Sequence, residues 1–585
     1  IGNYSEVLND KDAFAYGGGI YNHRGASIEN IKGNFSNNSA RALSDLYNAD
    51  AYGGAVVNGG TIENIAGDFL NNRAAASGTD ASAKGGAIYN YADATGSEQV
   101  ISTIGNIKGN FTGNVAEAIS NTNAEASGGA VYNGSSEINE AGAQGIINDI
   151  EGNFSNNSAT AQGLTGAISY GGAIYSQSGF GEINELENIK GTFEDNKIIA
   201  NTTDGNAAGY GGAISTSLTM AKNIEGDFIN NSVSVYSKTG NAVGCGGAVS
   251  NAALSTISNL EGNFINNNVN VKGINAAGYG GAVSNILGII GEYDEEGQLT
   301  SGIRNSSFYN NHVSAEGETA EAKGGAIYSN MDLKISADNG ESIFSGNYTE
   351  TNGIKKENAI YMANDMVESY NGTLTLESIN NGLILFNDEI EGDIGYNLVL
   401  KGDETSEIIF NNDIINAEIT IENTNVTANY GSYLAQSPTL TLNSGTLSIN
   451  HLPNAVINFE NLSNKGLINL NSIDVDLSNK TMGRITSDSY GDMTGTVDVK
   501  GLNIISHSNE DNISVPFADE HYSNTVKYSG NNEILTPVYK YYTDYEIKND
   551  NMGYFTFNRG NINDSNSYNP SVLAPSVSSQ AGAYT

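Results

Sequence analysis

The residues best suited to chemistry are closely spaced aspartates in the last quarter of the chain. Asp474 and Asp476 are separated by one residue, and Asp488 and Asp492 by three. These spacings can place both carboxylates on one face of a strand or at one corner. Paired carboxylates perform glycoside hydrolysis. The chain has 66 acidic residues, so composition alone produces such pairs and favours a solvated acidic face.

Histidine, the usual general base near neutral pH, is scattered. The five histidines are His23, His312, His451, His507 and His521. At the repeat position of His312 other repeats carry serine, arginine or lysine, which indicates an outward side chain. His23 precedes Arg24 in a turn of the first repeat, where we expect it to be exposed. The pattern favours neither a catalytic base nor a ligand.

The single cysteine, Cys245, excludes an intrachain disulfide and a multi-cysteine metal site. It stands directly before a Gly-Gly pair, where other repeats carry Tyr, Lys or Ser, so we interpret it as incidental. The sequence has no Gly-x-Ser-x-Gly, phosphate-binding loop, His-Glu-x-x-His or calcium-binding nonapeptide. We therefore predict no catalytic, cofactor-binding or metal-ligating residue, and a protein that is not an enzyme.

The charge of the chain restricts its partners. Lys and Arg number 26 and Asp and Glu 66, which gives a net charge of -40. Such a charge argues against binding nucleic acid or anionic membrane surfaces. The sequence contains no run of about 18 or more apolar residues, so we expect no membrane-spanning helix. The chain opens Ile1-Gly2-Asn3-Tyr4, without an initiator Met or an apolar signal core, and we expect a processed or excised segment.

The elements that position all these side chains follow from a repeat in the first three-fifths of the sequence. A Gly-Gly-(Ala/Gly)-(Ile/Val) motif alternates with Phe-x-x-Asn nine times. The Gly-Gly motifs start at Gly17, Gly53, Gly85, Gly128, Gly171, Gly211, Gly246, Gly280 and Gly324. The phenylalanines are Phe35, Phe69, Phe111, Phe154, Phe193, Phe228, Phe264, Phe308 and Phe344. Successive phenylalanines are 34 to 44 residues apart, a period typical of solenoids.

Each repeat predicts three short strands. After Gly-Gly, an Ile or Val is followed by a variable residue and then by Asn, Ser or Thr, the alternation of a strand with one buried face. A second apolar run follows, such as Ile62–Ile65, and a third strand carries the Phe. We predict an all-β, parallel β-helix with three strands per coil. Its phenylalanines would stack, and its corner asparagines would adopt the left-handed conformation and hydrogen-bond to one another.

The stretches between each Asn corner and the next Gly-Gly vary most in length and are rich in Ala, Ser, Asn and Thr. We interpret Ala116–Ser127 and Ser158–Tyr170 as loops that project from the solenoid. Tyr91–Val100 and Gly291–Thr300 receive the same interpretation. Insertions of this kind either carry the binding surface of a solenoid or merely connect its strands.

Changes in pattern divide the chain into four predicted parts. Residues 1–370 form the β-helix with both motifs. Residues 371–496 continue it with tighter coils, because alternating runs such as Thr373–Leu376 recur about every twenty residues. Residues 497–558 are rich in tyrosine and predict longer strands that cap the solenoid. Residues 559–585, rich in Asn, Ser and Pro, predict a linker.

The alternation of Gly-Gly-Ala-Ile with Phe-x-x-Asn over residues 17–347 resembles the polymorphic outer membrane protein family of autotransporters. The copy at Gly17 departs by having Gly19 in third place, and several copies end in Val. The end, Tyr545–Phe557 followed by Asn569–Pro575, is similar to the junction that precedes a translocator barrel. The resemblance implies a Gram-negative surface protein with a right-handed β-helical passenger. We expect the barrel itself to be absent from this chain.

The resemblance thus implies a passenger exposed at the cell surface or outer membrane, or secreted, that acts in adhesion or cell contact through loops and one face of the β-helix. Its partners would be a receptor or glycan on a host or neighbouring cell, and its own or a separate translocator barrel. No nucleic acid, cofactor or membrane span in this chain is expected. Two alternatives stay open: a structural or antigenically variable coat without a dedicated receptor, and a carbohydrate-active β-helix enzyme.

Overall fold

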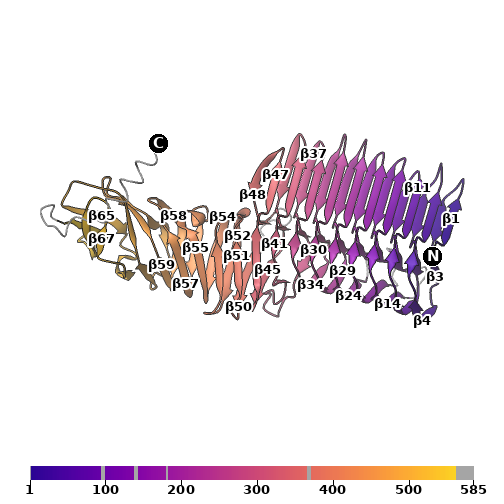
Figure 1. Cartoon of the computed structure of the whole chain (residues 1–585), viewed down its shortest axis with the longest axis horizontal. Coiled ribbons are helices and arrows are strands. Elements are labelled where there is room, and N and C mark those ends of the chain that lie inside the picture. The colour runs from indigo at the N-terminus through magenta and orange to yellow at the C-terminus, as the bar shows by residue number, and fades with distance from the viewer. Residues whose placement is uncertain (1, 94–98, 137–141, 180–181, 365–370, 561–585) are drawn as a thin grey trace. The chain divides into compact units, whose positions relative to one another are not determined.

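Parallel strands that stack one coil upon the next dominate the computed structural model, which describes residues 2–93, 99–136, 142–179, 182–364 and 371–560 (Figure 1). These residues form strands and two short 3-10 helices, η1 (Gly431–Leu434) and η2 (Ser523–Thr525), and no α-helix. The predicted parallel β-helix is confirmed. The chain divides into unit 1, Ile1–Leu374 with Asn387–Asp393, and unit 2, the described residues of Thr375–Phe386 and Ile394–Thr585.

The three predicted strands are present in the coils of unit 1. In the second coil they are β8 (Val56–Asn58), β9 (Thr61–Ala66) and β10 (Phe69–Leu70). They pair with β13 (Ile88–Ala92), β14 (Val100–Lys108) and β15 (Phe111–Thr112) of the next coil. Because each strand pairs with its counterpart one repeat later, equivalent residues become neighbours about 4.8 Å apart.

The repeated phenylalanines form one continuous column inside unit 1. Neighbouring ring centroids are 4.6 to 4.9 Å apart and the ring planes are parallel to within 6°. From Phe69 to Phe344 every ring is fully buried. Each offset ring pair contributes about 0.5–1.5 kcal/mol beyond the burial of its area.

The corner asparagines form a second, buried column. From Asn38 to Asn347, each Nδ2 donates to the Oδ1 of the equivalent asparagine in the next coil at 2.8–3.0 Å. The column ends at Asp388, whose carboxylate accepts from Asn347 Nδ2 at 2.7 Å. The left-handed conformation that we expected of these asparagines belongs instead to the preceding residue, for example Asn37 with φ 55°.

The stretches interpreted as projecting loops in Ala116–Ser127 and Ser158–Tyr170 are strands, so that interpretation is wrong. Two further strands per coil form two parallel sheets packed back to back, which we call the fin. One sheet contains β1 (Tyr4–Leu8), β6 (Ser39–Leu43), β11 (Arg73–Gly78), β16 (Val115–Ser120), β21 (Ser158–Gly163), β26 (Lys197–Thr202), β31 (Ser232–Ser237), β36 (Asn268–Lys272), β42 (His312–Glu316), β47 (Tyr348–Thr351) and the antiparallel β48 (Ile354–Glu357). The other contains β2 (Ala13–Tyr16), β7 (Ala49–Tyr52), β12 (Ala81–Lys84), β17 (Asn123–Ser127), β22 (Gly166–Tyr170), β27 (Asn206–Tyr210), β32 (Asn241–Cys245), β37 (Asn275–Tyr279) and β43 (Thr319–Lys323).

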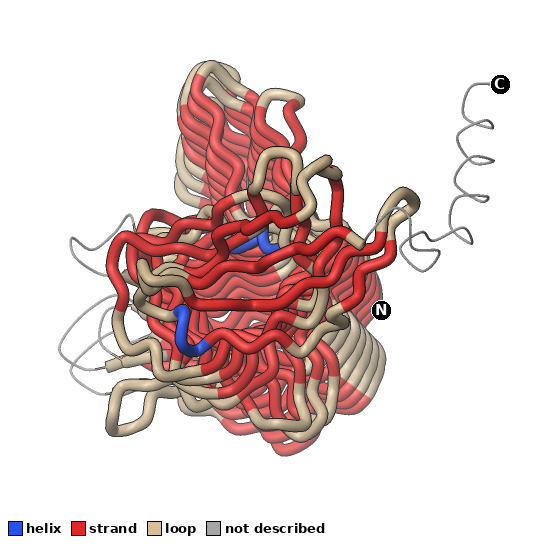
Figure 2. The backbone as a smooth tube through the Cα atoms, turned by 90° about the vertical axis from the view of Figure 1, so that its left-hand side faces the viewer, coloured by secondary structure: helices blue, strands red, loops and turns tan. Residues whose placement is uncertain are grey.

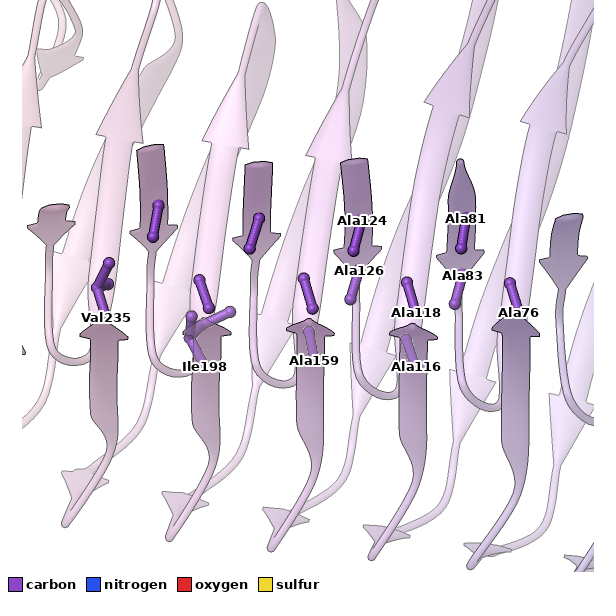
Figure 3. Packing of buried hydrophobic residues seen from close by; sticks show 14 of the residues in the cluster. Ala76, Ala81, Ala83, Ala116, Ala118, Ala124, Ala126, Ala159, Ile198 and Val235 are labelled. Carbon is purple, nitrogen blue, oxygen red and sulfur yellow. The ribbon is translucent and has the colours of Figure 1, made fainter. Parts of the chain in front are cut away.

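Alanine at every second position explains the fin. Ala116 and Ala118 of β16 face Ala124 and Ala126 of β17, and all four are at most 3% exposed (Figure 3). A methyl group is small enough for two sheets to pack closely without cavities. The stretches resembled loops because Ala, Ser and Asn are weak strand formers, although the period of two was present.

The other two predicted loops have different outcomes. Gly291–Thr300 contains no strand and only one isolated antiparallel bridge, between Tyr293 and Leu299, which confirms a connecting loop. Tyr91–Val100 has its centre, residues 94–98, outside the described residues.

Unit 2 by itself is also built of parallel coils, and these coils are shorter. One sheet carries β51 (Leu383–Phe386), β53 (Glu407–Phe410), β55 (Thr424–Tyr430), β57 (Gly445–His451), β59 (Leu467–Leu470), β63 (Thr496–Val499) and β66 (Val526–Tyr528). Another carries β54 (Ile414–Glu422), β56 (Thr439–Leu442), β58 (Val456–Asn464) and β62 (Arg484–Tyr490). Figure 2 shows that strands make up most of the described backbone.

The tyrosine-rich segment forms an antiparallel sheet in unit 2. Its strands are β65 (Asn512–Ala518), β69 (Gly553–Arg559), β68 (Lys540–Ile547) and β67 (Glu533–Leu535). β65 contacts β62 and β61 (Thr481–Met482). A connection from this sheet to a barrel stays a prediction, and residues 561–585 of the predicted linker lie outside the described part of the chain.

Candidate functional site

The Gly-Gly corner brings two outward-facing positions together. Tyr52 ends β7 before the corner, whereas Tyr89 lies in β13, after the corner of the next coil. The first glycine, such as Gly85 with φ 65°, has the left-handed conformation that the bend requires. A Cβ on the second glycine, Gly86, would lie 2.0 Å from the carbonyl oxygen of Gly129. Neighbouring coils can therefore approach this closely only if the residue at this position has no side chain. Two sheets therefore meet at a concave corner.

Tyrosines fill this corner. Neighbouring ring centroids are 4.7 to 5.7 Å apart. We call the set the tyrosine row: Tyr16, Tyr52, Tyr89, Tyr132, Tyr175, Tyr170 and Tyr210. The inner members are buried, with Tyr89 6%, Tyr132 3% and Tyr175 1% exposed, whereas Tyr16 is 42% exposed. Tyr89 and its equivalents occupy the variable position after the Ile or Val of each Gly-Gly motif, which the sequence predicts to face outward. In the structure, neighbouring tyrosines cover this position.

Cys245 continues the tyrosine row. It pairs in register with Tyr210 on one side and Tyr279 on the other, and it is 1% exposed. Burial raises the pKa of its thiol to about 12, which disfavours a reactive thiolate. Its position supports the interpretation of a tolerated packing residue.

Two hollows lie along the tyrosine row. The first, of about 490 Å³, lies over the outer face of the fin, and its lining includes Asp50, Ser82, Glu125 and Tyr170. The second, of about 420 Å³, is lined by tyrosines of the row together with Tyr21, His23 and Arg24. Volumes of this size are typical of small-molecule sites, which range over about 300–1,000 Å³.

The first hollow is acidic and partly desolvated. Lys84 Nζ lies 3.1 Å from Glu125 Oε1 and 5.4 Å from the centre of the Tyr132 ring. Burial alone would lower the pKa of Lys84, but Glu125 and the tyrosines raise it well above its usual value, so it stays charged. Burial raises the pKa of the Asp50 carboxyl to about 6, against the opposing effect of Lys84. The hollow thus contains charged and neutral oxygen acceptors side by side.

The aspartate pairs considered from sequence do not form a catalytic centre. Asp474 and Asp476 lie on the same face of β60 (Ile473–Asp476), as the spacing predicts, but Asp476 caps a turn. Hydrogen bonds from Ser478 and Asn479 lower the pKa of Asp476 to about 2. Asp488 accepts from Asn458 Nδ2 at 3.0 Å. Asp492 caps the turn before Thr494. Turn formation and coil stacking account for these carboxylates.

The histidines also occupy separate places. His451 Nε2 lies 3.3 Å from Asp474 Oδ2, a partly buried pair that the sequence did not predict. His312 lies on the outward face of β42 and stacks on Tyr348 at 4.9 Å. His521 stacks on Tyr490 with the ring centroids 4.5 Å apart, and the ring centroids of His507 and Tyr541 are 6.1 Å apart. His23 is exposed, as expected, and lines the second hollow.

Sequence reasoning missed the tyrosine row although its signal was present. Tyrosine precedes Gly-Gly in five of the nine repeats, at Tyr16, Tyr52, Tyr170, Tyr210 and Tyr279. The residue before Gly-Gly and the variable residue after the following Ile or Val each tolerate several residue types. Only the folded corner brings these two positions together. The hollow over the fin could not be predicted once the fin strands were interpreted as loops.

Within the described residues, no group of three or more His, Cys, Asp or Glu side chains is arranged to hold a metal ion. The same residues include no helix long and apolar enough to cross a membrane. No protein-family model, curated protein or solved structure matches the chain.

Proposed function

We propose that the protein is the β-helical passenger of an autotransporter and that it mediates adhesion through the outer face of unit 1. The observation that carries the proposal is the pair of hollows along the tyrosine row, on a scaffold whose repeated inward positions are occupied by packing columns. A scaffold of this kind leaves the outer face free to vary. The alternation of Gly-Gly-Ala-Ile with Phe-x-x-Asn supports the autotransporter assignment by resemblance.

The proposed location is the bacterial surface, or the medium after secretion. A translocator, its own or a separate one, would carry the passenger outward. The proposed partner is a receptor or glycan on another cell. A net charge of -40 disfavours nucleic acid and anionic membrane surfaces as partners.

The fin changes where the adhesive surface should lie. Residues 116–127 and 158–170 contribute paired strands, so they are a rigid face instead of flexible loops. Binding groups on rigid strands are held more accurately than groups on loops. The hollows also favour adhesion over an inert coat, because a coat needs no concave surface.

Adhesion can be tested with beads that carry the whole chain at one density. We expect such beads to bind to cell monolayers or immobilised surface glycans more than beads that carry an unrelated acidic protein. Substitution of the exposed Tyr16 and Tyr21 by serine should reduce this binding, whereas substitution of the exposed Tyr542 in unit 2 should not. Equal binding by passenger and control beads would support the coat alternative.

A carbohydrate-active enzyme is the second candidate, and one observation favours it. Asp50, with its raised pKa, and Glu125 lie in the same outward column of the fin, two strand spacings or about 10 Å apart. An acid with a raised pKa and a second carboxylate on the same face suit inverting glycoside hydrolysis. New reducing ends after incubation with polysaccharides, lost in Glu125→Gln, would establish this activity.

A further inference from the structure

We propose that the first hollow binds a chain of neutral sugars that lies along the stacking direction of the coils, an inference that rests on the proposed adhesive function. The strands beneath the hollow are β7, β12, β17 and β22, each paired with the next in register. The outward side chains of one column are Asp50, Ser82, Glu125 and Ile168. The proposal depends on what these side chains offer at regular spacing.

The column offers hydrogen-bonding groups at the strand interval. Asp50, Ser82 and Glu125 follow one another about 4.8 Å apart. A second row on the same face has Asp80 and Asn123, with Asn123 Nδ2 donating to Asp80 Oδ1 at 3.1 Å. Carboxylate and amide oxygens accept hydrogen bonds from sugar hydroxyls. A polymer of similar rings can meet equivalent groups in successive coils because its own repeat is comparable with the strand spacing.

Two features form the depression itself. Ser82 and Gly166 are small, whereas Tyr170 and Ile168 rise at one side and supply an apolar wall. The apolar face of a sugar ring packs against such a wall. The Oγ of Ser82 is buried and has no hydrogen-bond partner within the described part of the chain. A buried hydroxyl without a partner is uncommon, and contact with a sugar hydroxyl requires a neighbouring side chain to move aside.

Charge selects neutral over acidic sugars. Asp50, Asp80 and Glu125 line the hollow, and Lys84, beside the hollow, already pairs with Glu125 at 3.1 Å. An acidic glycan would bring further negative charge to this surface, and the described residues that line the hollow include no Lys or Arg. Heparin-like chains and uronic-acid polymers are therefore disfavoured.

The same surface argues against a peptide. Peptides that add a strand need an exposed sheet edge, but the floor strands of the hollow are paired on both sides. Their backbone groups are committed to neighbouring coils. Recognition must therefore use side chains, which suits a ligand rich in hydroxyl groups.

Titration calorimetry of the whole chain tests the proposal with short linear gluco-, manno-, xylo- and galacto-oligosaccharides, and with heparin oligosaccharides for comparison. We expect at least one neutral series to bind and heparin not to bind. Ser82→Tyr should weaken the binding about tenfold or more by filling the hollow, an effect of about 1.4 kcal/mol. Asp50→Asn, which keeps the shape, should weaken it about threefold to tenfold by removing a charged acceptor.

Ala277→Tyr is the matched control, because Ala277 occupies the same column of β37 and does not line the hollow. It should bind as the unmodified chain does. Binding of heparin but no neutral sugar, or binding by Asp50→Asn and Ser82→Tyr equal to that of the unmodified chain, would overturn the proposal. Peptide-library binding that Ser82→Tyr abolishes, without sugar binding, would also overturn it.

The bead assay separates this inference from the proposed function. If the beads adhere to cells and no sugar binds to the hollow, adhesion stands and the sugar site is wrong. If sugars bind to the hollow and the beads do not adhere, the site stands and the adhesive function is wrong. Circular dichroism of each variant identifies loss of fold, and Asp50→Asn provides the test if Ser82→Tyr does not fold.

Discussion

Unit 1 and unit 2 build the same kind of coil from different repeats. In unit 1 one column contains phenylalanine in all nine repeats. In unit 2 the corresponding column of one sheet reads Phe386, Phe410, Ala428, Ile449, Leu470 and Val499. Parallel pairing persists in both units, so the fold requires an inward apolar side chain at every second position. Identical side chains add register specificity, because a slipped strand would disrupt every stack.

The amide columns differ in their environment. Asn231 of unit 1 is fully buried, donates to Asn267 Oδ1 at 3.0 Å and accepts from Asn196 Nδ2 at 3.0 Å. In unit 2, Asn471 Nδ2 donates to Asn450 Oδ1 at 2.7 Å, in an exposed column. Water can replace the partners in the second column but not in the first. The same side-chain pairing should therefore matter far more in unit 1.

Loss of one buried amide should have the largest effect. Asn231→Ala removes the acceptor of two donors of Asn196 and the donor to Phe193 O and Asn267 Oδ1. Asn267 Oδ1 keeps the hydrogen bond from the backbone N–H of residue 231. We expect the free energy of unfolding of unit 1 to fall by about 3–5 kcal/mol, since each orphaned group costs about 1–3 kcal/mol. Asn450→Ala should cost about 0.5 kcal/mol. Urea unfolding followed by circular dichroism measures both, and equal costs would contradict the role of burial.

Removal of one aromatic ring should come next. Phe228 stacks on Phe193 at 4.9 Å and on Phe264 at 4.7 Å, whereas Phe410 has Phe386 at 5.6 Å. Phe228→Leu should cost about 2–3 kcal/mol and Phe410→Leu about 1 kcal/mol, because the first loses two ring pairs. The same urea experiment compares the two, and equal losses would show that the column owes its stability to apolar area alone.

A substitution in the fin tests the tight packing of its alanines in unit 1. Ala161 is fully buried between the two sheets, and its neighbour Thr160 faces outward. Ala161→Val should destabilise unit 1 by about 1–2 kcal/mol through overpacking. Thr160→Val should change stability by less than about 0.5 kcal/mol. Proteolysis within residues 158–170 provides a local measure, and rapid cleavage of the unmodified chain there would indicate a loop after all.

Two aspartates should give opposite pH dependence. The pKa of Asp50 is raised to about 6 from 3.8, so its protonated form favours the fold and stability falls as pH rises from about 4 through 6. Asp50→Asn should remove this fall and stabilise unit 1 at pH 7 by about 1 kcal/mol, after allowance for partial exposure.

For Asp476 of unit 2, we expect stability to change with pH in the opposite direction. Its pKa is lowered to about 2, so its contribution is present above about 4 and is lost as pH falls through 2. Thermal unfolding between pH 2 and 8 of the chain and both Asp→Asn variants measures the two slopes. A rise of stability with pH that Asp50→Asn removes would refute the assignment for Asp50.

The sequence alone determined the columns. Gly-Gly-Ala-Ile and Phe-x-x-Asn recur with fixed internal spacing, so the inward residues of a coil follow from period two, and stacking follows from their repetition. Phe35 to Phe344 and Asn38 to Asn347 lie where this reasoning places them. The alternating runs after residue 371 likewise predict the strands of unit 2.

Only the tertiary structure decided the fin and the hollow. Alanine contributes little to strand propensity by itself, and β16 and β17 are stable because their methyl groups meet across a second sheet. The tyrosine row and the column of Asp50, Ser82 and Glu125 join residues about 30 to 45 positions apart, which become neighbours through coil stacking. Outward side chains are not constrained by packing, so they show no repeat in the sequence. Which of them become neighbours follows only from the register in which the coils stack.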